Sequence, residues 1–491
     1  SVHVSNSAYG VENGGSLSLD GIVVSNSGYP VAIYDGSTGS GQNIDVDNVS
    51  AAIMSRGATS FTFDSIQVDD SVLLLDAIGS DGLEIRNLTG EGIDSLIIGT
   101  NMDGVIVDNW DVNSSGTSGW ALIVDTAGTF TLDNSEFNGF NKGLRLTGSG
   151  INTINNSVMT LSGPMFDVSG NGRLHTLSTS LSTTAEFGHL SGVDSFWSDN
   201  NLNGGSSSDG LELVSGKHVF NSTTYARNYL YSDSESFGLG VTWATVEANG
   251  LTLSGWSDGI QCRVDCLISG ASLTSNLGGV ASGSGIKIDG GIVELDTLTT
   301  GNSLNGIHLK DGNLHIGDWI GAGHGGPTLL VDADSTATIR NFPASSSNGL
   351  WDADGAGNLL FGGLNARINT SSYHEFTEST ISVSDLSSIP LVGVSVEAHG
   401  FTEVTDSNGE VQLPLLVGGT VVLANDGTYG VSDNFTPPGG NIQLPVIPSV
   451  GPWIIPTGVH AVLIGGNYTA PAGDNVTISS SSSLTLKNSH L

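Results

Sequence analysis

VIVDNWDV, at residues 105–112, and FTLDNSEF, at residues 130–137, are two versions of one eight-residue phrase. Each version has an apolar residue, any residue, an apolar residue, Asp and Asn, and then returns to apolar residues. Alternation of apolar and polar residues is typical of a half-buried β-strand. Asn tolerates the left-handed backbone conformation, which allows a sharp corner. The phrase therefore predicts a strand, a corner of one or two residues, and another strand.

The phrase recurs along the chain about every 23 residues, a period that predicts a solenoid. Taking its second apolar letter as the anchor of each repeat, we expect anchors at Leu19, Val46, Phe63, Ile85, Val107, Leu132, Ile154, Leu177, Trp197, Phe220, Val246, Ile268, Leu295, Ile316, Ile339, Phe361 and Val383. Two residues after the anchor stands Asn at 48, 87, 109, 134, 156 and 341, or Gly or Ser at 21, 65, 222, 270 and 363. Helical repeats are excluded, because no long segment has an apolar period of 3.6 residues. Each repeat is expected to form one coil of a parallel β-helix, paired with the next at about 4.8 Å.

The composition agrees with many short strands. The 491 residues include 70 Gly, with 38% hydrophobic and 13% charged residues, and Ser, Asn, Asp and Thr fill most of the polar positions. These residue types are poor helix formers and frequent turn residues. The regular spacing of the apolar residues argues against a disordered chain. We predict an all-β protein.

In its spacing and turn residues, segment 1–385 resembles the right-handed parallel β-helix repeat proteins. This broad group includes pectate lyases, polygalacturonases and many surface and adhesion proteins. The resemblance implies a right-handed parallel β-helix solenoid for residues 1–385. It specifies a fold much better than an activity, because one fold carries many functions.

The phrase stops near residue 385, and residues 390–415 read PLVGVSVEAHGFTEVTDSNGEVQLPL. Apolar and polar residues alternate here, and DSNG at 406–409 predicts a hairpin turn. Segment 386–448 resembles a carboxypeptidase regulatory-like domain, which is a small transthyretin-like β-sandwich and usually a spacer in large secreted proteins. The residues that carry this resemblance are Gly393, Val394, Val396, Ala398, Thr405, Asp406, Gly409, Leu413 and Pro414.

Residues 449–491 return to the first pattern and are expected to form a C-terminal β-helix-like coil segment. LTLKNSHL at 484–491 repeats the opening phrase, and VHVSNSA at 2–8 does the same at the other end. A solenoid normally needs polar caps, and these ends read like coils. Two alternatives follow: a segment of a longer protein, or a subunit whose ends stack into a fibre or cell-envelope layer.

The charge and the cysteines restrict the partners and the compartment. The formal net charge is −36, from 49 acidic and 13 basic residues, so nucleic acid and anionic membranes are poor partners. The sequence contains no apolar run of about 20 residues, so it predicts no helix that spans a membrane. Cys262 and Cys266 in QCRVDC predict a local disulfide, with two free buried thiols as the alternative, and a disulfide favours an extracellular or cell-surface protein. Nine sequons are glycosylation candidates: Asn48, Asn87, Asn113, Asn155, Asn221, Asn369, Asn434, Asn467 and Asn475.

Glycan binding has its best local candidate in TTYARNYLYSDSESFGLGVTW, residues 223–243. Alternation places four side chains on one face of a strand, with Trp243 nearby; the four are Tyr225, Arg227, Tyr229 and Tyr231. Aromatic faces combined with polar donors suit a sugar. The alternative is a loop that packs over the side of the solenoid.

The metal candidates are weaker. WDADGAGN at 351–358 offers Asp352, Asp354 and Asn358 as oxygen ligands of the kind that Ca²⁺ prefers, with a plain turn as the alternative. Ca²⁺ is the one cofactor that the sequence suggests. A transition-metal site would require convergence of His308, His315 and His324.

No catalytic residue is predicted. GAGHGG at 321–326 contains a Gly-His-Gly motif similar to that of polygalacturonases, but the accompanying motifs are incomplete and out of order. A pectate-lyase-like reaction needs a base and Ca²⁺-binding carboxylates; the candidates are Arg227 and Arg263, with Asp209, Glu212, Asp233 and Glu235.

The first hypothesis is an extracellular structural or adhesive surface protein that self-associates or binds cell-envelope components. A polysaccharide lyase or glycoside hydrolase is the second, and a non-catalytic glycan-binding protein is the third. We expect a protein without enzymatic activity, because its negative charge would repel an acidic polysaccharide.

Overall fold

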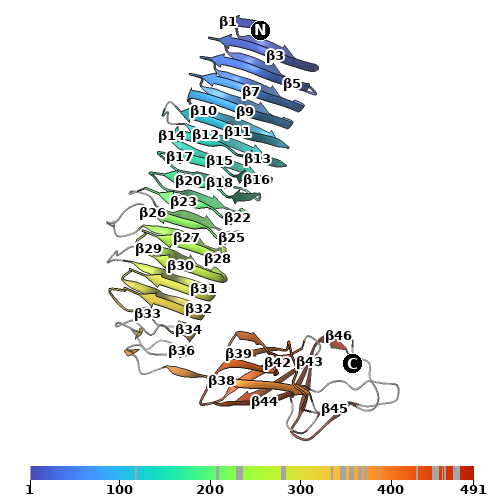
Figure 1. Cartoon of the computed structure of the whole chain (residues 1–491), viewed down its shortest axis with the longest axis vertical. Coiled ribbons are helices and arrows are strands. Elements are labelled where there is room, and N and C mark those ends of the chain that lie inside the picture. The colour runs from blue at the N-terminus through green and yellow to red at the C-terminus, as the bar shows by residue number, and fades with distance from the viewer. Residues whose placement is uncertain are drawn as a thin grey trace.

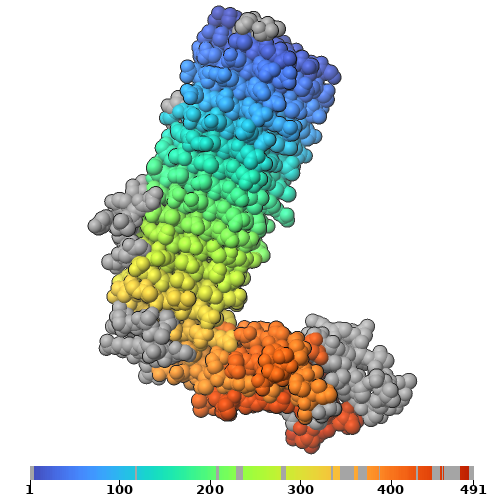
Figure 2. Space-filling model, viewed as in Figure 1, coloured from blue at the N-terminus to red at the C-terminus, as the bar shows by residue number. Residues whose placement is uncertain are grey.

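The structure is a computed structural model of the whole chain. It describes residues 2–490 except 115, 117–118, 206–208, 228–235, 278–282, 333–334, 343–349, 353–358, 363–367, 370–372, 386–387, 427–428, 445–452, 456, 458–459 and 468–475. The described chain forms strands and no helix: a parallel solenoid of about 18 turns is followed by a smaller unit (Figure 1). The solenoid is a long rod, and the second unit projects sideways from its C-terminal end (Figure 2). The all-β, parallel-solenoid prediction is confirmed.

Each coil of the solenoid contributes to three parallel sheets, which we name the β12, β13 and β14 sheets. Some strands pass through more than one sheet: β3 (Ser16–Ser25), β5 (Thr38–Asp47), β7 (Thr59–Asp69), β9 (Asp81–Ile93), β11 (Val105–Ser114), β28 (Thr245–Ser254), β30 (Cys266–Asn276), β31 (Ser284–Gly301) and β32 (Asn305–Ala322). The other strands of the β12 sheet are β2 (Tyr9–Asn13), β4 (Tyr29–Ile33), β6 (Ala51–Arg56), β8 (Leu73–Ile78), β10 (Ser95–Met102), β12 (Trp120–Thr126), β15 (Lys142–Gly148), β18 (Phe166–Ser169), β21 (Gly188–Ser191), β24 (Leu211–Val214), β27 (Phe237–Thr242), β29 (Asp258–Val264), β33 (Leu329–Val331), β35 (Leu350–Asp352) and β37 (Ile368–Asn369).

The remaining strands of the β13 sheet are β13 (Thr129–Asp133), β16 (Ile151–Asn155), β19 (Arg173–Leu177), β22 (Asp194–Ser198), β25 (Lys217–Asn221), β34 (Thr336–Asn341) and β36 (Leu359–Phe361). Those of the β14 sheet are β1 (Val2–Ser5), β14 (Glu136–Phe140), β17 (Val158–Leu161), β20 (Ser180–Thr183), β23 (Asn201–Gly204) and β26 (Thr224–Arg227). Within each sheet, a strand pairs with the equivalent strand of the next coil, as in the register Val107↔Leu132 and Leu132↔Ile154.

The Asp-Asn phrase marks the corner between the β13 and β14 sheets. Asn87, Asn109 and Asn134 have φ angles of 51, 57 and 47°, in the left-handed region where Asn is favoured among residues with a side chain. Their amides also connect the coils: Asn109 Nδ2 donates to Asn87 Oδ1 at 2.6 Å, and Asn134 Nδ2 donates to Asp108 Oδ1 at 3.0 Å. At these coils the phrase recurs because each corner Asn bonds to the corner of the coil before it.

The same phrase also occurs at a second corner, between the β14 and β12 sheets. Asn26 and Asn48 have φ angles of 49 and 52°, and Asn48 Nδ2 donates to Asn26 Oδ1 at 2.7 Å. The register pairs Val24 with Val46, so the expected anchor Val46 is wrong: it lies in the β14 sheet. Gly41 takes the anchor place in that coil.

Other expected anchors lie one or two residues away from the true anchor position, because small or polar residues occupy the core there. Ile154 pairs with Thr176 and not with Leu177, and Phe220 pairs with Ala248 and not with Val246. The last expected anchor, Val383, belongs to the core of the second unit, which is separate from the core of the solenoid.

Stacked side chains fill the interior of the rod. Trp197 lies parallel to Phe220 of the next coil, with ring centroids 5.6 Å apart. The buried polar groups beside Trp197 have partners: Trp197 Nε1 donates to Ser195 Oγ at 2.7 Å, and Ser195 Oγ lies 2.8 Å from His218 Nδ1. His218 Nε2 lies 3.0 Å from the carbonyl oxygen of Ser215. Burial lowers the pKa of His218 to about 4, so the imidazole is neutral at pH 7.

The second unit begins within β38 (His374–Asp385). The first residues of this strand pair with β36, and the rest pairs with β41 (Glu410–Leu416) and β44 (Gly439–Leu444). Opposite lies a sheet of β39 (Ser395–Ala398), β40 (Phe401–Val404), β42 (Thr420–Asn425), β43 (Tyr429–Phe435), β46 (His460–Asn467) and β48 (Ser483–His490). The two sheets share a core that includes Ile381, Val396 and Leu413. Membership of the transthyretin-like family stays a prediction.

The DSNG turn is present, but it does not form the predicted hairpin. Gly409 N donates to the Asp406 carbonyl at 3.0 Å, yet β40 before the turn pairs with β39, and β41 after it pairs with β38. DSNG therefore crosses between the two sheets. The hairpin is formed by His399 and Gly400, with φ angles of 53 and 83°, between β39 and β40.

The last described strands pair in parallel. Trp453 in β45 (Trp453–Ile455) pairs with Val476 in β47 (Val476–Ile478), and His460 in β46 pairs with Ser483 in β48. Both pairs join residues 23 positions apart, which is the solenoid period. β46 also pairs antiparallel with β43, so it continues a sheet of the second unit. A separate β-helix-like segment at residues 449–491 stays a prediction.

We predict that Asn109→Ala destabilises the solenoid more than Asn109→Gly. Alanine loses the amide ladder and must also adopt a left-handed backbone, at a total cost of about 2–3 kcal/mol, whereas glycine loses only the ladder, about 1 kcal/mol. Thermal denaturation followed by circular dichroism measures both. Asn138→Ala is the control, because Asn138 bonds only Glu136 of its own strand. Equal melting temperatures for the two Asn109 variants would contradict the role of the left-handed corner.

We predict that stability falls as the pH drops from 6.5 towards 4, in part because of His218. An unfolded His takes up a proton below its ordinary pKa of 6.5, whereas folded His218 does so only near 4, a difference worth about 3 kcal/mol. His218→Gln should remove this part of the pH dependence. Denaturant titrations at pH 7 and pH 4.5, monitored by tryptophan fluorescence, test it. An unchanged pH slope in the variant would show that other groups cause the loss.

Candidate functional site

Two residues of the predicted aromatic face, Tyr225 and Arg227, lie inside the rod. Alternation does place Tyr225 and Arg227 on one side of β26, but that side is the core: Tyr225 is 0% exposed and Arg227 is 8% exposed. The Tyr225 ring contacts Phe187 and Trp256, at centroid distances of 4.7 and 4.8 Å. A surface glycan does not reach Tyr225, so this part of the prediction is wrong.

Trp243 stands apart from that strand. It is 60% exposed and occupies the corner between β27 and β28, with a φ of 52°. It therefore lies between the β12 and β13 sheets, whereas Tyr225 belongs to the β14 sheet. Four other residues of the predicted constellations lie outside the described residues: Tyr229, Tyr231, Asp233 and Glu235.

The predicted disulfide is present between Cys262 and Cys266. It closes the corner between β29 and β30, where Asp265 has a φ of 44°. Among the sequons, four are exposed (Asn48, Asn87, Asn113 and Asn434) and two are half-buried (Asn155 and Asn221). The side chains of Asn369 and Asn467, and all of Asn475, lie outside the described residues. Asn48 and Asn87 also use their amides in the corner ladders.

The metal predictions gain no support. Asp354, Asn358 and the side chain of Asp352 lie outside the described residues. His308, His315 and His324 do not meet: His308 lies in the β12 sheet, His315 in the β13 sheet, and His324 bonds Thr300 and Ser303 at a corner. Within the described part of the chain, no group of three or more His, Cys, Asp or Glu side chains is arranged to hold a metal ion.

The outer surface of the β12 sheet contains two hollows that the sequence reading did not identify. The first has a volume of about 410 Å³, and its charged and aromatic lining includes Trp120, Lys142, Asp167, Glu186, His189 and Glu212. The second has a volume of about 750 Å³, and its lining includes Asp258, Gln261, Arg263, Lys287, His308 and Lys310. Asp209 and Phe237 line both hollows, so the two hollows adjoin and together form a trough along the rod axis. We call it the β12 trough.

Strand register brings these side chains together. Arg145, Asp167, His189 and Glu212 pair in succession along the β12 sheet, and Gln261, Lys287 and His308 do so further along. Neighbouring members of each ladder are one strand apart, about 4.8 Å. A linear ligand lying along the rod axis would therefore meet a polar side chain at almost every coil.

Ion pairs and ring contacts hold the trough in shape. Arg263 Nη1 lies 2.8 Å from Glu212 Oε1, and its guanidinium lies 4.6 Å from the centre of the Phe237 ring. His189 Nδ1 is 3.4 Å from Glu212 Oε2. The structure thus joins Arg263 and Glu212 of the predicted lyase constellation, and Asp209 lines the same trough. The other candidate base, Arg227, is buried in the β14 sheet.

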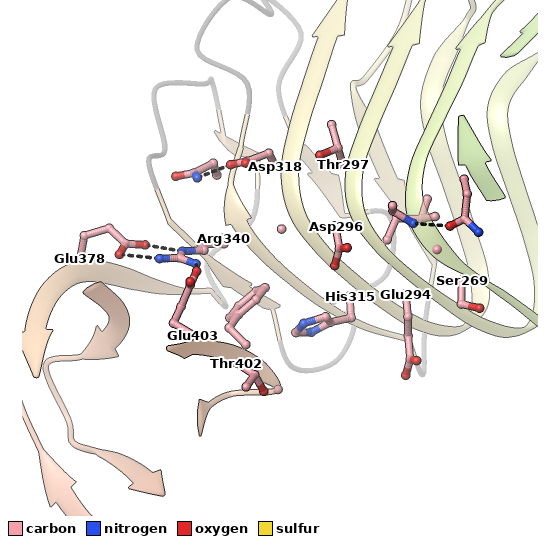
Figure 3. A pocket seen from close by; sticks show the side chains of 18 residues that line it. Ser269, Glu294, Asp296, Thr297, His315, Asp318, Arg340, Glu378, Thr402 and Glu403 are labelled. Carbon is pink, nitrogen blue, oxygen red and sulfur yellow. Dashed lines mark hydrogen bonds and ion pairs between the residues drawn. The ribbon is translucent and has the colours of Figure 1, made fainter. Parts of the chain in front are cut away.

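A second cavity lies where the two units meet (Figure 3). This junction cleft has a volume of about 1210 Å³, and corners of β30, β31, β32 and β34 form one wall while the β39–β40 hairpin forms the other. Arg340 crosses it: Nε lies 2.9 Å from Glu378 Oε1, Nη2 donates to the Gln412 carbonyl at 3.0 Å, and Nη1 pairs with Glu403. Arg340 links the solenoid to both sheets of the second unit.

His315 completes the junction. Its ring lies 4.2 Å from the ring of Phe401, measured between centroids, and Gly400 packs over it so closely that a Cβ there would lie 3.1 Å from His315 Cε1. Burial lowers the pKa of His315, and the charges of Glu294 and Asp296 oppose this shift only in part. The cleft is therefore first of all a structural joint between the units.

The register described above defines the class of the chain as a parallel β-solenoid. No family model and no curated protein matches its sequence. Among solved structures it is similar to a tailspike protein mutant of Escherichia coli bacteriophage HK620 in complex with a hexasaccharide, at 11% identity and a TM-score of 0.32, covering 87% of this chain and 86% of that one. It is also similar to PfbA, a surface adhesin of Streptococcus pneumoniae, at 9% identity and a TM-score of 0.22, covering 80% and 90%. At these similarities, what those proteins bind says nothing about this chain. Among the described residues, no helix has the length and apolar character needed to cross a membrane.

We predict that Arg340→Met loosens the joint between the two units without unfolding either. Methionine keeps an unbranched apolar side chain but loses the ion pairs with Glu378 and Glu403, the bond to Gln412 and the contact of the guanidinium with the Phe401 ring. Small-angle X-ray scattering should show a broader distribution of long intramolecular distances. Arg86→Met is the control, because Arg86 pairs with Glu84 on its own strand. An unchanged scattering profile would show that the His315–Phe401 contact is sufficient.

Proposed function

We propose that this chain is a rod-shaped adhesive protein that binds polysaccharide along the β12 trough. The observation that carries the proposal is the trough itself: a continuous row of hydrogen-bonding and aromatic side chains on one sheet of a rigid rod. A polysaccharide is a long chain of hydroxyl groups and apolar sugar faces. Trp120, at one end of the trough, is half-buried, and Lys142 Nζ lies 5.5 Å from the centre of its ring. This aromatic and cationic pair and the other charged side chains suit sugar rings and hydroxyl groups.

The rod supports an adhesive role by its stiffness. Coils joined by parallel hydrogen-bonded ladders and by corner amides make an elongated body that presents the trough along its length. The second unit, held by Arg340, sets a fixed angle at one end (Figure 2). Extracellular or cell-surface placement belongs to this proposal and is consistent with the Cys262–Cys266 disulfide.

A catalytic alternative uses the same trough. Glu186, Asp209 and Glu212 are carboxylates in the first hollow, and His189 and Arg263 both contact Glu212. Carboxylates in a groove are the usual acids and bases of glycoside hydrolysis. Incubation with bound polysaccharides, with and without Ca²⁺, distinguishes the alternatives: new reducing ends would indicate a hydrolase, unsaturated ends a lyase, and intact chains an adhesive protein.

We predict that Trp120→Ala lowers affinity for a bound glycan about tenfold, the loss typical of an aromatic anchor. A glycan array identifies the ligand, and isothermal titration calorimetry measures the change. Trp243→Ala is the matched control, since Trp243 is exposed but lines neither hollow. A loss with Trp243→Ala and none with Trp120→Ala would move the site to the corner at residue 243. Absence of binding to any polysaccharide would overturn the proposal.

A further inference from the structure

The distribution of charge along the β12 trough carries one more inference. Over the whole chain, acidic residues outnumber basic ones by 49 to 13. The lining of the second hollow reverses this balance, with three Lys or Arg side chains and two Asp side chains. One of these carboxylates, Asp258, is 8% exposed and already accepts bonds from Ser284 N at 2.6 Å and Gln261 Nε2 at 2.7 Å. The other, Asp209, is exposed and lies on the edge that this hollow shares with the first one. The basic groups are therefore concentrated in the part of the hollow formed by β29, β31 and β32.

The three basic side chains come from three successive coils. Arg263 belongs to β29, Lys287 to β31 and Lys310 to β32, so they follow one another along the rod axis. The two ammonium groups share a single carboxylate: Lys310 Nζ lies 3.2 Å from Asp289 Oδ1, and Lys287 Nζ lies 3.8 Å from Asp289 Oδ2. The one negative charge of Asp289 is shared by two ammonium groups, so these three side chains together keep a net charge of about +1.

The geometry of each group suits an anion on the ligand. Lys287, Lys310 and Arg263 have side chains that are 29, 39 and 36% exposed, so they are partly desolvated yet reachable. Arg263 uses Nη1 for Glu212 and Nε and Nη2 for Gln261 Oε1, and its stacking over Phe237 fixes the plane of the guanidinium. Charge-assisted hydrogen bonds from such preorganised donors are stronger than bonds between neutral groups.

We infer that the second hollow is an anion subsite, in which Lys287, Lys310 and Arg263 bind a carboxylate or sulfate substituent of the polysaccharide. This inference rests on the proposed function, because it assigns the chemical class of the ligand in the same trough. It also reverses the expectation that the net charge excludes an acidic polysaccharide. The overall charge acts at long range and is screened within about 8–10 Å at physiological salt, whereas contact with the hollow is local.

The test compares three probes of matched length: an oligogalacturonate, the same oligosaccharide after chemical reduction of its carboxyl groups, and a sulfated neutral oligosaccharide. The full chain should bind the oligogalacturonate or the sulfated probe at least tenfold more tightly than the reduced one. A preference for the first identifies a carboxylate, and a preference for the second a sulfate. Equal binding of all three would overturn the anion subsite and leave the proposed function standing. No binding of any probe, together with a silent glycan array, would overturn both.

Variants localise the effect. Lys287→Met with Lys310→Met should reduce binding of the preferred acidic probe about tenfold and leave binding of the reduced probe unchanged. Asp289→Asn should strengthen binding of the acidic probe severalfold, because it removes the charge that the two lysines share. Lys217→Met is the matched control, since Lys217 pairs with Glu247 at 2.8 Å on the β13 sheet, away from the trough. Weaker acidic binding in the Asp289→Asn variant, or an equal loss in the control, would contradict the inference.

Discussion

Stacking of coils in register is the constraint on which the rest of this protein depends. Each coil must place a strand at the same position as the coil before it, because the backbone groups of a parallel strand are satisfied only by its neighbours on both sides. The corners must therefore superpose as well. Asn meets both requirements at once, since it accepts the left-handed backbone and its amide bonds the equivalent residue one coil away. Asn109 and Asn87 show both features: each has a left-handed backbone, and Asn109 Nδ2 donates to Asn87 Oδ1.

Register also explains how a chain with few basic residues can assemble a site from them. Lys142, Arg263, Lys287 and Lys310 are four of the 13 basic residues in the sequence, and all four line the β12 trough. The first and the last of them, Lys142 and Lys310, are 168 positions apart in the sequence, yet the coils align them along one side of the rod. Carboxylates such as Glu212 and Asp289 hold them in place, so the trough combines binding groups with the partners that orient them.

The junction between the solenoid and the second unit is built differently from the trough. A single residue, Arg340, reaches from the last described coils to Glu378, Glu403 and Gln412 on two different sheets. Half-buried ion pairs of this kind contribute little net stability but impose strict geometry, because their hydrogen bonds fail when the partners move. The second unit is thus oriented by a polar joint with limited apolar support from His315 and Phe401. Its position relative to the trough also depends on β38, whose first residues pair with the solenoid strand β36 and whose other residues pair within the second unit.

The sequence by itself determined the architecture, since a strand-corner-strand phrase repeated every 23 or so residues has few other physical solutions. It also determined the local disulfide, because Cys262 and Cys266 can meet without any long-range contact. The register of the coils could not be read fully from the sequence. Thr176, Ala248 and Gly41 occupy anchor positions although they are small or polar, and Val46 and Asn48 repeat the phrase at another corner. Alternation correctly grouped Tyr225 with Arg227 but could not say which side faces the core; the rings of Phe187 and Trp256 in neighbouring coils decided that. The β12 trough was decided by tertiary structure alone, because its residues come one or two at a time from strands of separate coils, and only stacking makes them neighbours.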